Sequence, residues 1–180
     1  MSNHELSQAV KRIAWGYILI HVHFNIGTLD LLPDWLAYVL FLGALPVVAK
    51  TTPSANLLRP LTILLACWSG VVWLLGNSWV PGLVSVIVDI VSLYFHFQLL
   101  TELALLARVY SCPQEGSILK LRTVRTVLLT LMALPFWQSL PDSELIIILF
   151  VAASLLVALC LCVSLFSLRR SLTEQEAQTN

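Results

Sequence analysis

The sequence predicts an all-α polytopic membrane protein with six transmembrane helices and with both termini in the cytoplasm. Of its 180 residues, 58% are hydrophobic and only 11% are charged, whereas a soluble domain has about a quarter of its residues charged. The apolar residues fall into six runs, and a helix needs roughly 20 apolar residues to cross a bilayer. The runs cover residues 9–27, 35–49, 57–75, 80–107, 121–137 and 144–168.

The six runs form one transmembrane domain that spans residues 1–180, ending in a polar cytoplasmic tail at 171–180. The second run is the shortest, and Lys50 must extend toward the lipid headgroups for it to span. The loop RVYSCPQEGSILK before the fifth run predicts a turn around Pro113 and Gly116. Ser117 is placed to cap the fifth helix.

The distribution of basic residues predicts the orientation, because Lys and Arg are retained on the cytoplasmic side of short loops. All of them fall at one side of the six-span arrangement, before the first helix, between the second and third, between the fourth and fifth, and after the sixth. They are Lys11, Arg12, Lys50, Arg59, Arg108, Lys120, Arg122, Arg125, Arg169 and Arg170. We therefore expect a multi-pass protein of a cell membrane, with the lipid bilayer as its first partner.

Composition and motifs exclude several classes of function. The formal net charge is zero and no basic patch is present, so we expect no nucleic-acid partner. There is no His-Glu zinc motif and no serine on a glycine-flanked turn, so we do not expect an enzyme. Cys160 and Cys162 project about 200° apart on a helix and cannot hold one metal, and we expect no metal and no cofactor.

Polar residues within the fourth run form a stripe. Ser85, Asp89, Ser92 and His96 project within about 60° of one another on a helix. An ionisable residue inside a membrane costs about 2.5 to 3.5 kcal/mol, so this stripe is expected to face the bundle interior or a watery cavity. Nearer the cytoplasm, Glu102 and the residue four before it form a patch where hydration or salt bridging is expected.

The first run carries a matching stripe on which Tyr17, His21, Asn25 and Thr28 share a face. His21 and Asp89 both lie about 12 Å from the outer ends of their helices, which allows the two to pair. Two interpretations remain open. In one, these residues are interhelical hydrogen-bonding groups; in the other, they form a proton relay or a solute-binding site.

The segment between the first two runs reads as an outward-facing corner. Gly27 is suited to end the first helix, Pro33 to open the second, and Asp34 to lie at the positive end of the second helix. Asp30 and Asp34 also offer oxygens suited to a hard cation. These residues stand in FNIGTLDLLPDWLAYVLFLGAL.

That stretch, together with IVSLYFHFQLLTELALLARVY, resembles a group of small, uncharacterised bacterial multi-pass membrane proteins. The resemblance covers about 45 residues, and it implies a bacterial inner-membrane location without implying an activity. It draws functional interest to residues of the corner and of the second helix. These are Asn25, Gly27, Asp30, Pro33, Asp34 and Tyr38.

The sequence thus favours a protein that binds or transports a small solute or ion at an intramembrane polar site. The residues expected to form the site are Asp89, His21, Asn25, His96 and Ser85. The alternative is a non-catalytic accessory or scaffold protein that stabilises or regulates a membrane-protein partner, or a second copy of the same chain.

Overall fold

The computed structural model describes residues 3–21, 25–26, 29–30, 34–76, 80–133 and 143–179. Within these ranges the chain is mostly helical, with short turns between helices and one antiparallel pair of two-residue strands. The elements are α1 (Asn3–His21), β1 (Asn25–Ile26), β2 (Leu29–Asp30), α2 (Asp34–Val48), the 3-10 helix η1 (Pro53–Leu57), α3 (Leu58–Leu75), α4 (Gly82–Val109), α5 (Glu115–Ala133) and α6 (Ser143–Thr179).

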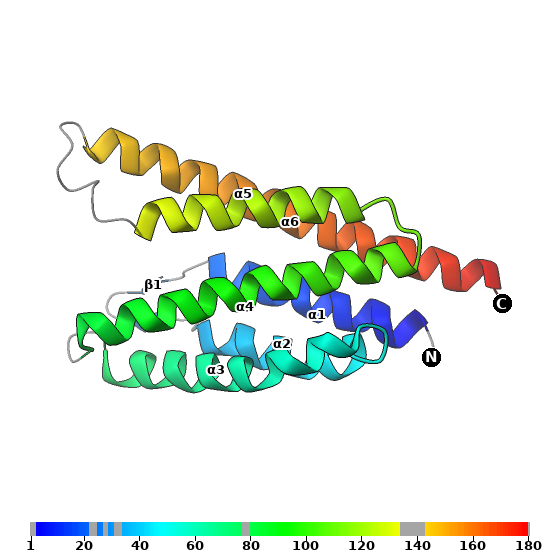
Figure 1. Cartoon of the computed structure of the whole chain (residues 1–180), viewed down its shortest axis with the longest axis horizontal. Helices are drawn as coiled ribbons and strands as arrows, with labels where there is room; N and C mark the ends of the chain where they lie inside the picture. The colour runs from blue at the N-terminus through cyan, green and yellow to red at the C-terminus, as the bar shows by residue number, and fades with distance from the viewer. Residues whose placement is uncertain are drawn as a thin grey trace.

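The helices form a ring in chain order. Each helix packs against the next one, and α6 returns to pack against α1. Both chain termini lie at one end of the bundle, together with η1 and the turn from α4 to α5 (Figure 1). The end of α3 and the start of α4 lie at the opposite end. We refer to these as the terminal end and the distal end.

Three helical segments are long and apolar enough to cross a membrane. They are Pro53–Leu75, Gly82–Val109 and Leu145–Gln175. The helix α2 is apolar but shorter. Lys11 and Arg12 lie inside α1, and three basic residues lie inside α5, whereas the sequence placed all of them at or before helix starts.

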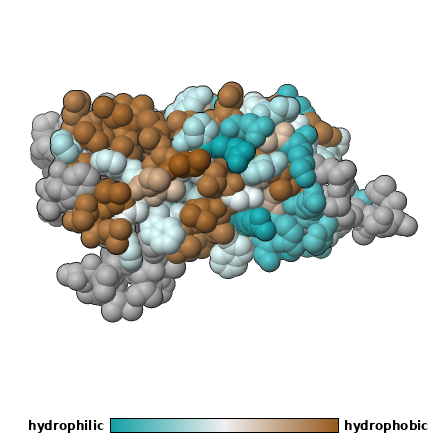
Figure 2. All heavy atoms as spheres, turned by 90° about the horizontal axis from the view of Figure 1, so that it is seen from below, coloured by the Kyte–Doolittle hydropathy of each residue, from teal (hydrophilic) through white to brown (hydrophobic). Residues whose placement is uncertain are grey.

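The hydropathy of the surface changes along the length of the bundle. Figure 2 shows hydrophobic residues gathered toward the distal end and hydrophilic ones toward the terminal end. Leu74 at the end of α3 and Leu83 at the start of α4 are 72% and 76% exposed. Because a protein in water rarely exposes a large apolar surface, this half has the character of a lipid-facing surface.

The helix α1 begins six residues before its predicted start and ends six residues before its predicted end. A buried stripe with helical spacing explains the early start, formed by Leu6, Ala9, Val10, Ile13, Ala14 and Tyr17. The helix α1 packs against both α2 and α6, and Ser7 is hydrogen-bonded to Thr173 of α6 at 2.9 Å between hydroxyl oxygens. Polar residues around the stripe concealed it from a reading based on apolar run length.

The helix α6 continues to Thr179, so the expected polar tail 171–180 is helical over its described part. Leu161, Leu165, Leu168 and Leu172 are all fully buried, and their spacing of four, three and four residues carries the apolar face past Arg169. The prediction ended this helix at Leu168 because two basic residues follow. Packing against α1 extends it.

The turn from α4 to α5 is closed by a residue in the left-handed region. Ser111 has φ 51°, its N–H donates to the Arg108 carbonyl (3.0 Å), and the N–H of Cys112 donates to the Ala107 carbonyl (2.8 Å). This pair of bonds is a Schellman ending. After this short turn α5 begins at Glu115, six residues before its predicted start. The Nε of Arg108 donates a hydrogen bond to Glu115 Oε1 across the turn (2.7 Å).

Candidate functional site

An aromatic cluster fills the interior of the ring. Tyr17 of α1 has its ring centroid 5.4 Å from that of Phe41 in α2 and 5.5 Å from that of His96 in α4. Phe95 lies 5.2 Å from His96 and 5.8 Å from Tyr38. These separations are typical of edge-to-face and tilted aromatic pairs. The cluster joins three helices that are distant in the sequence.

A glycine in α1 allows the Phe41 ring of α2 to pack closely against the α1 backbone. A side-chain carbon added at Gly16 would stand 2.4 Å from Cε1 of the Phe41 ring, which is far inside van der Waals contact. Gly16 therefore lets Phe41 approach the backbone of α1. The same approach brings Phe41 against the Tyr17 ring.

The polar atoms of the cluster pair with one another. His96 is 3% exposed, and its Nδ1 lies 3.3 Å from the Tyr17 hydroxyl. The Tyr38 hydroxyl lies 3.4 Å from Ser92 Oγ on α4. Burying such groups requires hydrogen-bond partners, and here the partners come from neighbouring helices.

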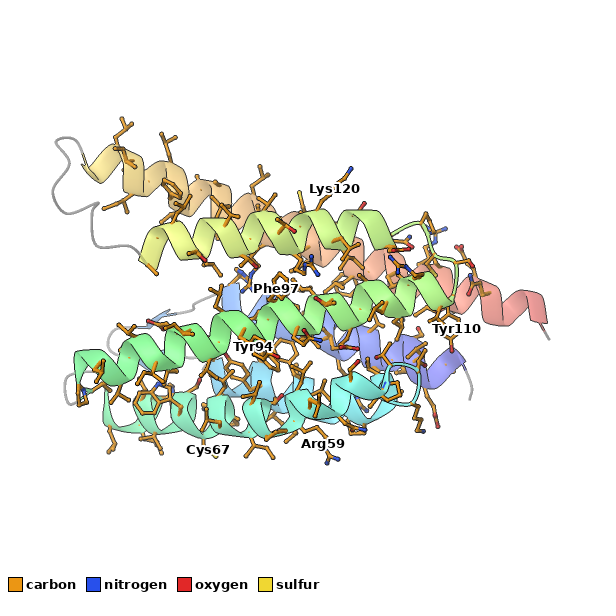
Figure 3. The ribbon with its side chains drawn as sticks, viewed as in Figure 1. Arg59, Cys67, Tyr94, Phe97, Tyr110 and Lys120 are labelled. Carbon is orange, nitrogen blue, oxygen red and sulfur yellow. The ribbon has the colours of Figure 1, made fainter. Side chains whose placement is uncertain are left out.

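Basic side chains near this region have different environments. Arg59 on α3 and Lys120 on α5 point away from the bundle on opposite sides, whereas Phe97 of α4 faces α5 (Figure 3). The Arg122 guanidinium carbon lies 4.2 Å from the Phe97 ring centroid, and its Nη1 donates to Thr101 Oγ1 (2.9 Å). Arg122 is thus held at the α4–α5 interface.

Arg125 is the buried cation of the bundle interior. It lies ten residues into α5, about 15 Å along the helix axis, and is 8% exposed. Its guanidinium carbon lies 5.5 Å from the Tyr17 ring centroid. Its Nε is buried without a hydrogen-bond partner among the described residues. The ion pairs found in the described ranges are Lys50–Glu5, Arg108–Glu115 and Arg170–Glu174, so no described carboxylate pairs with Arg125.

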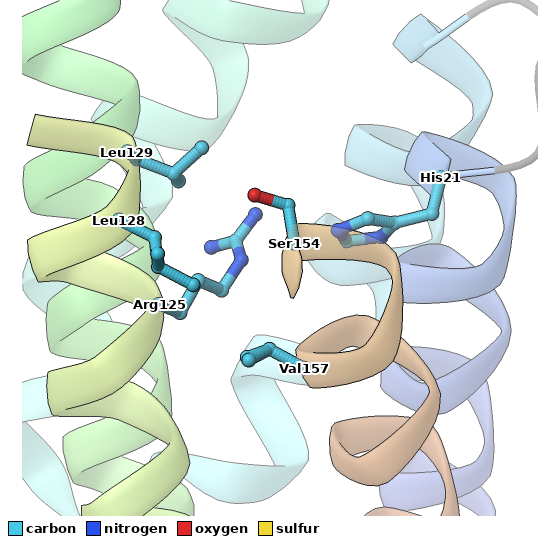
Figure 4. A pocket seen from close by; sticks show the side chains of 6 residues that line it. All are labelled: His21, Arg125, Leu128, Leu129, Ser154 and Val157. Atoms are coloured by element: carbon cyan, nitrogen blue, oxygen red, sulfur yellow. The ribbon is translucent and has the colours of Figure 1, made fainter. Parts of the chain in front are cut away.

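A small cavity lies beside Arg125. Its volume is about 20 Å³, and it is lined by His21, Arg125, Leu128, Leu129, Ser154 and Val157. The Arg125 guanidinium and the Ser154 hydroxyl point toward the space between α5 and α6, with the His21 ring on its far side (Figure 4). About 10 to 15 Å³ of this kind of space suffices for a water molecule, so the cavity accommodates one small species.

The hydrogen bond made by His21 indicates which of its ring nitrogens carries a proton. Its Nδ1 lies 2.7 Å from the backbone carbonyl oxygen of Tyr17. A carbonyl oxygen only accepts hydrogen bonds, so Nδ1 carries a proton and donates it. Tyr17 therefore links His21 to His96, through its carbonyl on one side and through its hydroxyl on the other.

A second buried charge lies toward the terminal end. Glu102 is fully buried, although its position near the cytoplasm had suggested hydration or salt bridging. Ser54 Oγ of η1 donates to one carboxylate oxygen (2.8 Å), and Gln98 Nε2 donates to the other (2.8 Å). Both oxygens of Glu102 are thus satisfied by neutral donors.

The structure brings together only part of the predicted site. His21 and His96 meet at Tyr17, whereas Asp89 lies on the exposed surface of α4 and Ser85 is half-buried. No side-chain hydrogen bond or ion pair joins Asp89 to another described residue. The pairing of His21 with Asp89 is therefore not formed. The polar stripe of α4 is buried only near His96, because the distal parts of α3 and α4 are largely exposed.

The predicted corner differs from expectation in part. Because α1 ends at His21, Asn25 belongs to β1 and not to the helix face that carries His21; it pairs in register with Asp30 of β2. Asp34 begins α2, as expected for an acidic residue at the positive end of a helix. Gly27 and Pro33 lie outside the described residues.

The sequence reading missed Arg125 and undervalued Tyr17 and Tyr38. Arg125 was assigned to the cytoplasmic loop because it follows three other basic residues. A helical signal was nevertheless present. Ile118 and Arg125 are seven residues apart and Leu129 follows four later, which places Arg125 on the buried face of α5.

Comparison with protein-family models, curated proteins and solved structures finds no match for this chain. The resemblance of the corner to small bacterial multi-pass proteins therefore stays an expectation. Among the described residues, no group of three His, Cys, Asp or Glu side chains is arranged to hold a metal ion.

Proposed function

We propose that this chain is a six-span protein of the bacterial cytoplasmic membrane, with both termini cytoplasmic, that binds or transfers a small solute or ion at an intramembrane polar site. The site comprises Arg125, Tyr17, His96 and His21. The observation that carries the proposal is the buried Arg125 guanidinium, which borders a cavity and has no carboxylate partner among the described residues.

Energetics favour a binding role for Arg125 over a purely structural one. A charged side chain at the centre of a bilayer costs at least about 2.5 to 3.5 kcal/mol, and structural cations normally recover this cost through paired carboxylates and complete hydrogen bonding. Arg125 has a ring contact with Tyr17 but an unsatisfied Nε. The Nε atoms of Arg122 and Arg169 also lack partners in the described ranges, but of the three residues only Arg125 is buried as a whole and lines the cavity. A ligand that completes its interactions accounts for the arrangement.

The six-span topology is supported by the segregation of charge along the bundle and is tested by cysteine labelling. In a chain whose native cysteines are replaced by serine, Lys50→Cys is expected to react only with a reagent that reaches the cytoplasmic side. Pro81→Cys is expected to react only from the outside. Labelling of both positions from the same side would contradict the topology.

The binding function is tested by thermal unfolding of the purified protein in detergent against a panel of small anions, cations and zwitterions. At least one member is expected to raise the unfolding temperature of the wild type but not that of Arg125→Met, because ligands that bind only the folded state stabilise it. If no member produces a shift that depends on Arg125, the proposal is wrong.

The accessory or scaffold function is a second candidate, favoured by Asp89. This acidic residue is exposed on α4 among apolar neighbours, and Val86 and Ile90 are 54% and 61% exposed. A carboxylate on a lipid-facing surface is costly, and a basic residue on a partner helix would offset the cost. Loss of a co-purifying membrane protein in Asp89→Leu, with no ligand-induced shift in the wild type, would favour this function.

A further inference from the structure

The side chains that line the Arg125 cavity limit the charge of its ligand. The six lining residues comprise one guanidinium, one imidazole, one hydroxyl and three aliphatic side chains, and no carboxylate. Arg125 offers only donors, and its Nε has no partner among the described residues. The cavity therefore presents the positive charge of Arg125 and the hydroxyl of Ser154 without any carboxylate, which favours an anion over a cation. The Nδ1 proton of His21 is engaged by the Tyr17 carbonyl and is not offered to the cavity.

The volume of the cavity limits the size of the ligand. About 20 Å³ accommodates roughly one water-sized species. A polyatomic anion or an amino acid would need more space than this or a shift of the lining side chains. A monatomic anion, which gathers donors from several directions, fits it better than a planar or branched one.

The walls of the cavity strengthen binding of such an ion. Leu128 and Leu129 of α5 and Val157 of α6 surround the polar groups with hydrocarbon. A charge pair in a low-dielectric site interacts more strongly than one in water. The guanidinium and the Ser154 hydroxyl approach from α5 and α6 respectively (Figure 4). Ser154 Oγ donates a long hydrogen bond to Met132 Sδ (3.9 Å), and by exchanging this weak acceptor for an ion it would join the two helices.

We propose that this cavity binds one small monovalent anion of about chloride size, held by the Arg125 guanidinium and the Ser154 hydroxyl at the α5–α6 interface. The inference rests on the proposed function and names the class of its ligand. His21 lines the far side of the cavity (Figure 4).

The test is a chloride titration of the purified protein, with unfolding temperature as the readout and with gluconate replacing chloride at constant sodium. The wild type is expected to show a saturable rise with chloride and none with sulfate. Arg125→Met is expected to lose the rise. Ser154→Ala is expected to raise the half-saturating concentration about tenfold, because it removes one hydrogen bond to a charged group. Lys120→Met removes the same charge from the exposed face of the same helix and is expected to keep the wild-type response.

The outcomes separate this inference from the proposed function. A saturable chloride response that persists in Arg125→Met, or is lost equally in Lys120→Met, overturns the anion site. An Arg125-dependent response to a cation or neutral solute, without one to chloride, overturns the anion and leaves the function standing. No Arg125-dependent response to any solute overturns both. Should Arg125→Met fail to fold, an unchanged half-saturation in Ser154→Ala overturns the anion site.

Discussion

Arg125 and Glu102 are both ionisable residues buried inside the same helical ring, yet their surroundings differ. Glu102 lies toward the terminal end, and each of its carboxylate oxygens accepts a hydrogen bond from a neutral side chain. Arg125 borders a cavity, and its Nε has no partner among the described residues. Glu102 therefore resembles a completed structural interaction, whereas Arg125 resembles an incomplete one.

Burial alone therefore does not identify a functional charge. A buried polar group with all its partners stabilises and specifies a fold, and removing it leaves those partners unpaired. A buried charge that lacks partners destabilises the fold, and its retention indicates another role. The two residues are therefore expected to respond to substitution in opposite ways.

Glu102→Ala is expected to have the largest effect on stability. It removes the acceptor for Ser54 and Gln98 and leaves a gap where a fully buried side chain stood. We expect the free energy of unfolding to fall by about 3 kcal/mol, measured by denaturation in mixed micelles. Gln98→Ala, which leaves the Ser54 bond intact, is expected to cost about 1 kcal/mol. Equal effects of the two variants would contradict the completed network.

Gly16→Ala is expected to have the next largest effect on stability, because its new methyl group would overlap the Phe41 ring. We expect a loss of about 2 kcal/mol in unfolding free energy, together with a weaker ligand response, since Phe41 supports the Tyr17 ring beneath Arg125. Gly116→Ala is the matched control, because a methyl group there meets nothing within 4 Å. A stabilising Gly16→Ala would show that α1 and α2 are less closely packed than described.

Asp89→Asn is expected to leave stability in detergent unchanged or slightly raised, by less than about 0.5 kcal/mol, because it removes a charge from an apolar surface without breaking a described interaction. The residue is exposed and has no described partner to lose, so the chloride response should also stay at the wild-type level. The same thermal titration measures both. Loss of the chloride response in Asp89→Asn would show that Asp89 takes part in ligand binding together with Arg125.

The smallest expected effect is on the alkylation rate of Cys112, a buried thiol at the terminal end. Burial raises the pKa of the Cys112 thiol, so less of it is thiolate at neutral pH and alkylation is expected to be slow there, accelerating as the pH rises. Gln175 Nε2 lies 4.0 Å from Sγ. Gln175→Ala is expected to speed maleimide labelling, followed by mass spectrometry. Rapid labelling of the wild type at neutral pH would contradict the burial of Cys112.

Much of the fold was predictable because apolar runs and charge segregation are dominant signals in membrane proteins. Six transmembrane helices were expected; six α-helices occur in the described ranges, and three helical segments among them are long and apolar enough to cross a membrane. The ends of α1 and α6 were missed because both helices continue as amphipathic segments that pack on each other, and run length does not detect a stripe such as Leu6 to Tyr17.

The site was less predictable, because it depends on which helix faces meet. His21 and His96 were identified because an ionisable side chain in an apolar segment carries a free-energy cost, and both contact Tyr17. Asp89 was assigned to the interior by the same reasoning but is exposed, since a stripe does not reveal where the packing of its helix ends. Arg125 was assigned to a loop because the basic-residue rule treats every Arg near a helix start as a topological signal.

The most direct test of the central claim is the stability of Arg125→Met in buffer without small anions. If Arg125 is retained for binding, the methionine variant removes an incompletely satisfied buried charge and keeps similar volume, so it should unfold at the wild-type temperature or above it. Its unfolding temperature should then stay constant when chloride is added, while that of the wild type rises. A variant that unfolds well below the wild type and still responds to chloride would contradict a binding role for Arg125.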